Sequence, residues 1–285
     1  MEQMSKRKKL FQAKDHLVSG ESFDIYWNDN KKRAETGINI DKKDLSRYYE
    51  SSAYNSYKSN IQNSTDRIYF TIQKLMFHYK KRILRQHHAG NKIMDYGGGA
   101  GGFAFYLSKK GYDTTVIEPN KTARDSAKSK GVIAYKSIDE LPALEVFNVI
   151  TLWHVLEHLP KPERVLINLR QLMKPKDVLV IAAPNFNSLD AKLYQKDWAA
   201  LDVPRHLWHF TSQGLIPLVE SLGFEFKKKY PLWFDAFYIA YLSEKHKGNR
   251  FSLISGLWLG FRSNFKALFN GEYSSLIYVF NKYSI

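Results

Sequence analysis

The segment Lys92–Phe103 reads KIMDYGGGAGGF and decides which fold the chain adopts. Its first five residues have the length and apolar content of a strand, glycines dominate the next six, and a helical pattern follows. A glycine-rich motif has meaning only in this strand–loop–helix context. The glycines permit a tight turn and a close approach of the backbone to a ligand, and the helix N-terminus offers free N–H groups. The segment therefore predicts a ligand-binding loop at the carboxyl end of a strand.

Strands and helices alternate from this loop onward. The pattern predicts strands at 92–96, 113–118, 132–135, 146–152 and 177–183, and helices at 102–110, 121–130, 162–173 and 212–222. Such alternation indicates right-handed crossovers and a parallel sheet covered on both faces. Two further strands, at 224–230 and 275–282, lack crossover spacing and predict an antiparallel edge. The expected fold is a doubly wound, mostly parallel, seven-stranded α/β sheet with an N-terminal helical extension and a C-terminal helical insertion.

The pattern divides the chain into four parts. Residues 1–65 are polar, without a clear period, and predict an irregular extension with short elements. Residues 66–232 form the expected core, led by an amphipathic helix over 66–88. Residues 233–270 are aromatic-rich and predict a helical lid or insertion. Residues 271–285 hold the final strand.

Composition excludes several classes of site. The chain has 285 residues and no cysteine, which excludes a disulfide framework, a thiolate zinc site and a cysteine nucleophile. Its formal net charge is +15, concentrated in the two ends of the chain. No module that reads nucleic acid accompanies this charge, so no nucleic-acid partner is expected. The oligomeric state is not readable.

The sequence also gives an expectation for the compartment. The basic start has no apolar stretch behind it, so it is not a secretory signal. No uncharged run approaches the ~20 residues of a spanning helix. We therefore expect a cytoplasmic protein, and the basic ends leave open a peripheral contact at the inner face of a membrane.

Two carboxylates discriminate between the ligands of a glycine loop. The loop fits both the dinucleotide fingerprint G-x-G-x-x-G and the G-x-G-x-G loop that binds S-adenosylmethionine (SAM). Asp95 lies two residues before Gly97, where it would repel a pyrophosphate but attract the ammonium and sulfonium groups of SAM. Glu118 ends the next strand, where a carboxylate accepts ribose hydroxyls in either ligand. The pattern favours SAM, with S-adenosylhomocysteine as the product.

Several segments resemble the class I SAM-dependent methyltransferases, in the branch that includes the ubiquinone-biosynthesis O-methyltransferases. These are MDYGGGAGGF (94–103), VIEPN (116–120) and FNVITLWHVLEHLPKP (147–162). Residues 184–215 resemble the methyltransferase-23-like bacterial subgroup with its Trp…Asp-x-Pro-Arg-His…His-Phe-Thr signature, and LSRYYESSAY (45–54) resembles a stretch that often precedes the domain. The resemblance implies the Rossmann-like methyltransferase fold. Some relatives carry a Cys-rich zinc ribbon first, which this chain lacks.

The motifs and the resemblance together give a set of expected contacts. SAM is expected to contact Asp95, Gly97, Gly98, Gly99, Gly101, Glu118, Pro119, Ser137, Ile138, Trp153 and His154. The acceptor is expected to contact Tyr54, Asn185, Trp198, Arg205 and His209.

The segment Trp153–His158 (WHVLEH) contains His-x-x-Glu-His, which also marks a class of zinc proteases. That motif belongs on a helix with a further ligand, whereas here it leaves a strand, so a protease is disfavoured. Glu157 and His158 either orient the acceptor or brace the following helix. Quinone-type relatives can bind a divalent ion with acidic residues near here, but His154 stands where an acid often does. Because Mg²⁺ prefers oxygen ligands, no metal is expected.

The 29-residue stretch Ala183–Thr211 leaves the carboxyl end of a strand, where doubly wound folds bind ligands. Transfer of a methyl group to a hydroxyl needs a base with a pKa near 7, and histidine is the usual choice. His206 is the first candidate and His154 the second. Arg205 could bind an anionic group of the acceptor or form a salt bridge with Asp202. His206 could equally be a structural histidine.

The C-terminal segment Phe251–Ile285 carries an aromatic stripe. Its members at helical spacing are Ile254, Trp258, Phe261, Phe265, Leu268 and Phe269. We interpret this stripe as core, in a lid or a wall of the acceptor pocket, with an interfacial membrane helix as the alternative.

The expected function is SAM-dependent methyl transfer to a small-molecule, sugar or lipid-like acceptor, at oxygen, with nitrogen and carbon acceptors left open. Two alternatives stay open: an NAD(P)-dependent oxidoreductase, and a non-catalytic SAM-fold protein that binds a partner or a membrane. Asp95 and the lack of a Tyr-x-x-x-Lys pair after the fourth strand count against the first. The intact glycine loop and Glu118 count against the second.

Overall fold

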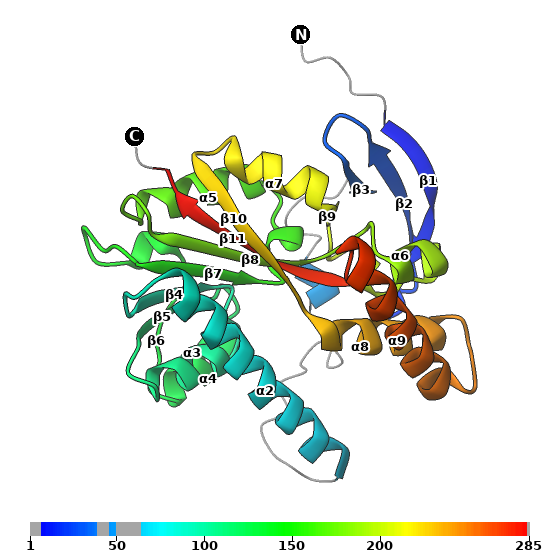
Figure 1. The fold of residues 1–285 in the computed structure, drawn as a ribbon, viewed down its shortest axis with the longest axis horizontal. Helices are drawn as coiled ribbons and strands as arrows, with labels where there is room; N and C mark the ends of the chain where they lie inside the picture. The colour runs from blue at the N-terminus through cyan, green and yellow to red at the C-terminus, as the bar shows by residue number, and fades with distance from the viewer. Residues whose placement is uncertain (1–6, 39–45, 50–63, 284–285) are drawn as a thin grey trace.

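The computed structural model describes residues 7–38, 46–49 and 64–283. Its larger sheet has seven strands in the order β10-β11-β8-β7-β4-β5-β6 (Figure 1). They are β4 (Lys92–Tyr96), β5 (Asp113–Ile117), β6 (Ile133–Tyr135), β7 (Val149–Trp153), β8 (Val178–Pro184), β10 (Phe224–Pro231) and β11 (Ser275–Lys282). Neighbours from β6 to β8 pair in parallel, while β11 runs antiparallel to β8 and β10 antiparallel to β11. The predicted sheet and its antiparallel edge are confirmed.

Helices cover both faces of this sheet, as a parallel sheet requires. They are α2 (Ser64–His87), α3 (Gly102–Ser108), α4 (Lys121–Ser129), α5 (Pro162–Gln171) and α7 (Ser212–Glu220). All seven residues of β8 are buried, which explains its uninterrupted apolar run. On one face, β4 and β7 pack with Ile83 and Leu84 of α2 and Phe103 of α3. On the other, their alternate residues pack with α5 and α7.

The expectation of an irregular N-terminal extension is wrong for residues 7–37. They form β1 (Arg7–Lys14), β2 (Ser22–Asn28) and β3 (Arg33–Gly37), an antiparallel sheet completed by β9 (Trp208–Phe210). In β1 only Phe11 and Ala13 are even partly buried. Its sequence therefore shows too short an alternation of apolar and polar residues to predict a strand. The small sheet buries one face against a segment some 160 residues further along the chain. Local pattern therefore could not predict it.

That distant segment is the stretch that follows β8. It contains α6 (Leu189–Tyr194), η4 (Gln195–Asp197), η5 (Ala199–Leu201) and then β9. Tyr194, Trp198 and Leu201 pack with Phe23 and Ile25 of the small sheet in one core. The small sheet thus lies beside the carboxyl end of β8 (Figure 1).

Two helices, α8 (Trp233–His246) and α9 (Ser252–Asn270), are inserted between β10 and β11, which confirms the predicted helical insertion. The interpretation of the α9 stripe as core is wrong, because each member that we named is more than half exposed. Periodicity shows that a helix has an apolar face but does not show which face packs. The opposite face of α9, made of small residues, is the buried one.

Candidate active site

The glycine loop follows β4 and leads into α3. Gly97, Gly99 and Gly101 all have positive φ angles, between 56° and 72°, a region that other residues rarely adopt. A Cβ atom at Gly97 would lie 2.5 Å from Val155 Cγ2, and one at Gly101 would lie 2.7 Å from Ala127 Cβ. Conformation and packing thus both require glycine here, and they fix the loop at the sheet edge.

Asp95 and Glu118 lie at the carboxyl ends of the neighbouring strands β4 and β5. Asp95 is 4% exposed and accepts a hydrogen bond from Thr151 Oγ1 at 2.7 Å. Burial raises the pKa of Asp95 to about 6, although Thr151 and the nearby Lys80 charge act in the opposite direction. Glu118 accepts hydrogen bonds from the Gly99 and Asn120 backbone N–H groups, at 3.0 and 2.8 Å. Burial raises its pKa as well.

The other predicted SAM residues lie at the same sheet edge. Pro119 follows Glu118, and the Glu118 N–H donates to the carbonyl of Tyr135, which ends β6 just before Ser137 and Ile138. Trp153 ends β7, and within the described residues its buried indole N–H has no acceptor. The register of four parallel strands thus brings together residues that are far apart in sequence. A loop that only glycine fits, the buried carboxylate of Asp95 and the half-buried carboxylate of Glu118 suit a cationic ligand such as SAM.

Sequence reasoning missed Lys80 on α2. Its Nζ lies 4.0 Å from the centre of a Trp153 ring. The negative charges of Asp95 and Asp235 are close enough to act on Lys80 and raise its pKa. Burial nevertheless lowers the pKa of Lys80 to about 8. In the sequence, Lys80 is one of several lysines on a basic helix and carries no local signal.

His154 follows β7 and is held between two carboxylates. Its φ is +55°, its Nδ1 lies 3.3 Å from Glu157 Oε1, and its Nε2 lies 3.1 Å from Asp235 Oδ2. Burial alone would lower the pKa of His154, but the two carboxylates outweigh it and raise the pKa well above its usual range. A histidine held in its charged form is a poor base. Asp235, on α8, was not anticipated.

A cavity of about 470 Å³ lies beside this histidine. His154 and Pro184 line it from the carboxyl ends of β7 and β8, and His206 lines it from the Asp-Val-Pro-Arg-His segment. One face of α8 supplies Asp235, Tyr238, Ile239, Leu242 and His246. Lys14, at the end of β1, and His16 and Leu17, in the turn that follows β1, also line the cavity. The cavity therefore joins the predicted SAM edge to parts of the chain that sequence reasoning did not connect.

His206 fits the role of a base better than His154 does. Its Nδ1 lies 2.8 Å from the Ala200 carbonyl, which can only accept, so Nδ1 carries the hydrogen and Nε2 holds the lone pair of the neutral ring. Nε2 lies 3.9 Å from Asp202 Oδ2, a carboxylate that would stabilise a protonated ring. The side chain is mostly buried but contributes to the cavity wall.

Arg205, expected to contact the acceptor, joins two parts of the structure. Its side chain is 1% exposed, and its guanidinium lies 2.7 Å from Asp202 Oδ1 and 3.0 Å from Asp15 Oδ1. It also donates to the Tyr48 carbonyl at 3.3 Å. The salt bridge to Asp202 is therefore present, and the Asp15 contact ties the N-terminal sheet to the cavity wall.

The remaining predicted acceptor residues have different surroundings. Trp198 is 2% exposed, donates to Asp190 at 2.8 Å, and contributes to the cavity wall. Asn185 is fully buried and donates to Glu272 and to the Tyr273 carbonyl. His209 is buried, with Nε2 2.9 Å from Thr36 Oγ1, and burial lowers its pKa to about 3. These hydrogen bonds hold Asn185 and His209 in the framework. Tyr54 lies outside the described residues.

Three side chains could hold a metal ion together. Within the described residues, Glu157, His158 and His206 offer ligand atoms that all lie within 4.8 Å of one another. A carboxylate with two imidazoles suits zinc or iron better than Mg²⁺, which prefers oxygen ligands. The donor set therefore does not fit Mg²⁺. That the chain works without a metal stays a prediction.

Comparison with known proteins agrees with this geometry. The chain is 27% identical over 159 residues to a ubiquinone biosynthesis O-methyltransferase of Rickettsia akari, covering 51% of this chain and 61% of that one. It is 31% identical over 170 residues to the protein of the same name from Pasteurella multocida, covering 48% and 70%. For several other curated relatives, the chain spans only about half of their length.

The fold also matches a solved structure, magnesium protoporphyrin IX methyltransferase from Synechocystis PCC 6803 with bound S-adenosylhomocysteine. The TM-score is 0.56 at 12% identity, covering 85% of this chain and all of that one. At such low identity the likeness shows the fold alone. A family model described as "Methyltransferase domain" matches residues 69–228, more than half of the chain. The chain therefore belongs to this methyltransferase-domain family, whose cofactor is S-adenosylmethionine.

Proposed function

We propose that the chain transfers a methyl group from SAM to a hydroxyl oxygen of a small, lipid-like acceptor bound in the 470 Å³ cavity. One observation carries the proposal: His154 and Pro184, at the ends of β7 and β8, line the same cavity as His206. The cavity thus connects the cofactor edge of the sheet with a candidate base. The relatives named for ubiquinone biosynthesis support oxygen as the acceptor atom and a lipid-like acceptor. A sugar acceptor is the alternative.

Residues at the sheet edge would hold the cofactor. The glycine loop and Glu118 would hold its nucleoside part, and Asp95 would face its charged end. When bound, SAM supplies an electrophilic methyl group on a sulfonium. Lys80 and His154 add positive charge near the same edge, while Asp95, Asp235 and Glu157 balance it. In this proposal His154 positions Asp235 and the wall of the cavity, and it does not accept a proton.

The acceptor side would supply orientation and proton transfer. With SAM bound, the acceptor oxygen would form a bond to the methyl carbon as the carbon–sulfur bond breaks, and sulfur would keep that electron pair. His206 Nε2 accepts the hydroxyl proton, and Asp202 stabilises the resulting imidazolium. The cavity wall, which includes Trp198 and Leu201, excludes water from the reacting atoms.

The proposal is tested by His206→Ala, with the exposed His78→Ala on α2 as a matched control. Turnover is followed as S-adenosylhomocysteine formed from a panel of prenylated catechols, plain catechols and sugars. We expect His206→Ala to lower kcat roughly a hundredfold or more, the usual contribution of a general base, and to leave S-adenosylhomocysteine affinity unchanged. Wild-type turnover in His206→Ala would rule out the base, and turnover only with sugars would rule out the lipid-like acceptor.

A further inference from the structure

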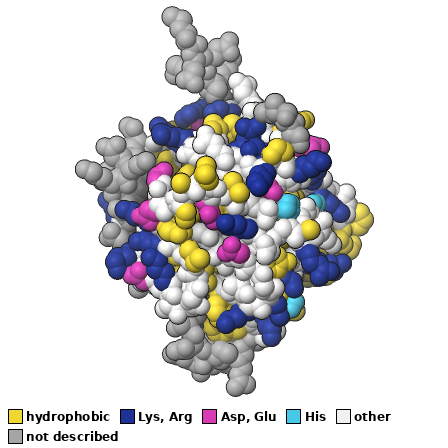
Figure 2. Space-filling view, turned by 90° about the vertical axis from the view of Figure 1, so that its left-hand side faces the viewer, with side chains coloured by type: hydrophobic (Ala, Val, Ile, Leu, Met, Phe, Trp, Pro, Cys, Tyr) yellow, Lys and Arg dark blue, Asp and Glu magenta, His cyan; other side chains and the backbone are white. Residues whose placement is uncertain are grey.

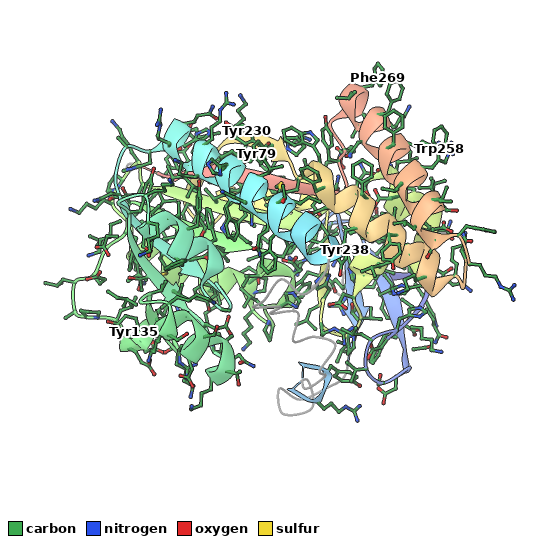
Figure 3. All side chains as sticks on the ribbon, turned by 90° about the horizontal axis from the view of Figure 1, so that it is seen from below. Tyr79, Tyr135, Tyr230, Tyr238, Trp258 and Phe269 are labelled. Atoms are coloured by element: carbon green, nitrogen blue, oxygen red, sulfur yellow. The ribbon has the colours of Figure 1, made fainter. Side chains whose placement is uncertain are left out.

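The outward face of α9 is almost entirely apolar. Eight large side chains on it are between 51% and 75% exposed: Leu253, Ile254, Leu257, Trp258, Phe261, Phe265, Leu268 and Phe269. Phe251, just before the helix, is 71% exposed. Trp258 and Phe269 point away from the rest of the molecule in Figure 3. Exposed apolar patches of this size mark an interaction site.

The inward face of α9 is made of small residues. Gly256, Gly260, Ser263 and Ala267 are its buried members. A Cβ atom on Gly256 would lie 2.5 Å from Tyr241 Cα, and one on Gly260 would lie 2.7 Å from the Cα of Phe237, so α8 and α9 pack with their backbones close together. A helix that faces water buries its large apolar side chains, whereas α9 does the reverse. Small residues inside and large apolar residues outside are typical of helices surrounded by lipid.

Positive charge borders this apolar face. Between Lys245 and Gly271 the chain has no acidic residue and five basic ones. They are Lys245, Lys247, Arg250, Arg262 and Lys266, and all five are exposed. The opposite end of the molecule differs, since hydrophobic side chains there are scattered among charges of both signs (Figure 2). Aromatic residues bordered by lysine and arginine are characteristic of helices that lie in an anionic membrane interface.

Charge complementarity selects a membrane over a second copy of the chain. In a symmetric dimer the same patch meets itself, so the basic residues of one α9 would approach those of the other. Anionic lipid headgroups would neutralise them instead. None of the helices in the described part of the chain is long and apolar enough to cross a bilayer. We propose that α9, 19 residues and ~28 Å long, lies flat on an anionic phospholipid surface with its aromatic face among the acyl chains.

The position of α8 connects this docking surface to the cavity. Phe237 and Tyr241 of α8 contact the glycines of α9, while Tyr238 and Leu242, on another face of α8, line the cavity. One helix thus separates the acceptor cavity from the membrane-facing helix. The supply of a lipid-like acceptor from the bilayer rests on the proposed function. The docking of α9 does not, so the two can fail separately.

The test is co-sedimentation of the full chain with vesicles. The vesicles contain either phosphatidylcholine alone or phosphatidylcholine with phosphatidylglycerol. The apolar variant is Trp258→Ser/Phe265→Ser, and the charge variant is Arg262→Glu/Lys266→Glu. Leu75→Ser serves as the matched control, because Leu75 is 55% exposed on α2, away from α9. Circular dichroism and calorimetric titration with S-adenosylhomocysteine verify that each variant is folded and keeps its cofactor site.

We expect the wild type and Leu75→Ser to sediment with phosphatidylglycerol vesicles and much less with phosphatidylcholine alone. Both α9 variants should lose at least about tenfold in partition coefficient. Equal sedimentation of wild type with and without vesicles would overturn the proposal. So would a dimer that Trp258→Ser/Phe265→Ser abolishes while vesicle binding is absent. Vesicle binding without turnover of prenylated acceptors would uphold docking and reject the lipid-like acceptor.

Discussion

The cofactor side and the acceptor side of the site are built in opposite ways. The glycine loop, Asp95 and Glu118 lie within 24 consecutive residues, and one strand–loop–helix–strand unit places them. The cavity wall instead depends on contacts such as Arg205 to Asp15, which join residues 190 positions apart. The candidate cofactor residues thus lie close together in the sequence. The wall of the proposed acceptor cavity instead depends on how the N-terminal sheet packs against the segment that follows β8. Acceptor specificity therefore cannot be read from the motif that identifies the family.

The largest effect is expected at the contact that joins the two sheets. Arg205→Met should lower the free energy of unfolding by about 3–5 kcal/mol, because the buried Asp15 and the partly buried Asp202 would both lose their guanidinium partner. Urea unfolding measures this change, and Arg170→Met, at a less buried arginine of α5, is the control. A stable Arg205→Met protein that has lost only acceptor affinity would show that Arg205 binds substrate and does not hold the wall.

The next largest effect is expected at the buried carboxylate of Asp95, in the way the free energy of unfolding depends on pH. Burial raises the pKa of folded Asp95 to about 6, above the 3.8 of the unfolded chain. Between these two pH values the Asp95 carboxyl binds its proton more tightly in the folded protein than in the unfolded chain. Ionisation of Asp95 therefore lowers the free energy of unfolding as the pH rises from 4 to 7. Asp95→Asn removes the effect. Its stability relative to wild type should rise by about 2–3 kcal/mol over that range.

Urea unfolding of both proteins at pH 4 and pH 7 gives this difference. The exposed Asp113→Asn, at the start of the neighbouring strand, is the matched control variant. A constant stability difference between Asp95→Asn and wild type across the range would mean that Asp95 is already ionised at pH 4. Its environment would then be far more polar than the structure indicates.

The smallest effect is expected from chelation. If Glu157, His158 and His206 form only a polar network, treatment with EDTA should leave turnover and S-adenosylhomocysteine binding unchanged. Elemental analysis of the purified protein should then show no stoichiometric metal. Stoichiometric zinc or iron whose removal abolishes turnover would contradict this expectation, and it would make His206 a ligand instead of a base.

The sequence predicted those features that short-range periodicity determines. The seven-stranded sheet, the helix before β4, the glycine loop and the positions of Asp95 and Glu118 all follow from alternation within about 30 residues. The N-terminal strands did not follow, because only Phe11 and Ala13 of β1 are even partly buried and the sheet is completed by residues 208–210.

Side-chain partners across the site were equally hidden. Asp235, which forms a salt bridge with His154, lies 81 residues further along the chain on α8. Lys80, whose ammonium group packs on the Trp153 ring, lies on α2, outside the strand–helix alternation. Sequence spacing does not contain these contacts, because they depend on how complete elements pack. The outward apolar face of α9 was mistaken for core for the same reason.

The proposed methyl transfer requires that SAM bind at the sheet edge formed by β4 and β5. Calorimetric titration with S-adenosylhomocysteine tests it most directly, on the wild type, Asp95→Ala, Glu118→Ala and the control Asp113→Ala, with NADH as a second ligand. We predict micromolar binding of S-adenosylhomocysteine alone, weakened at least tenfold (about 1.4 kcal/mol) in Asp95→Ala and Glu118→Ala and unchanged in Asp113→Ala. Binding of NADH alone, or unchanged affinity in both site variants, would contradict the account.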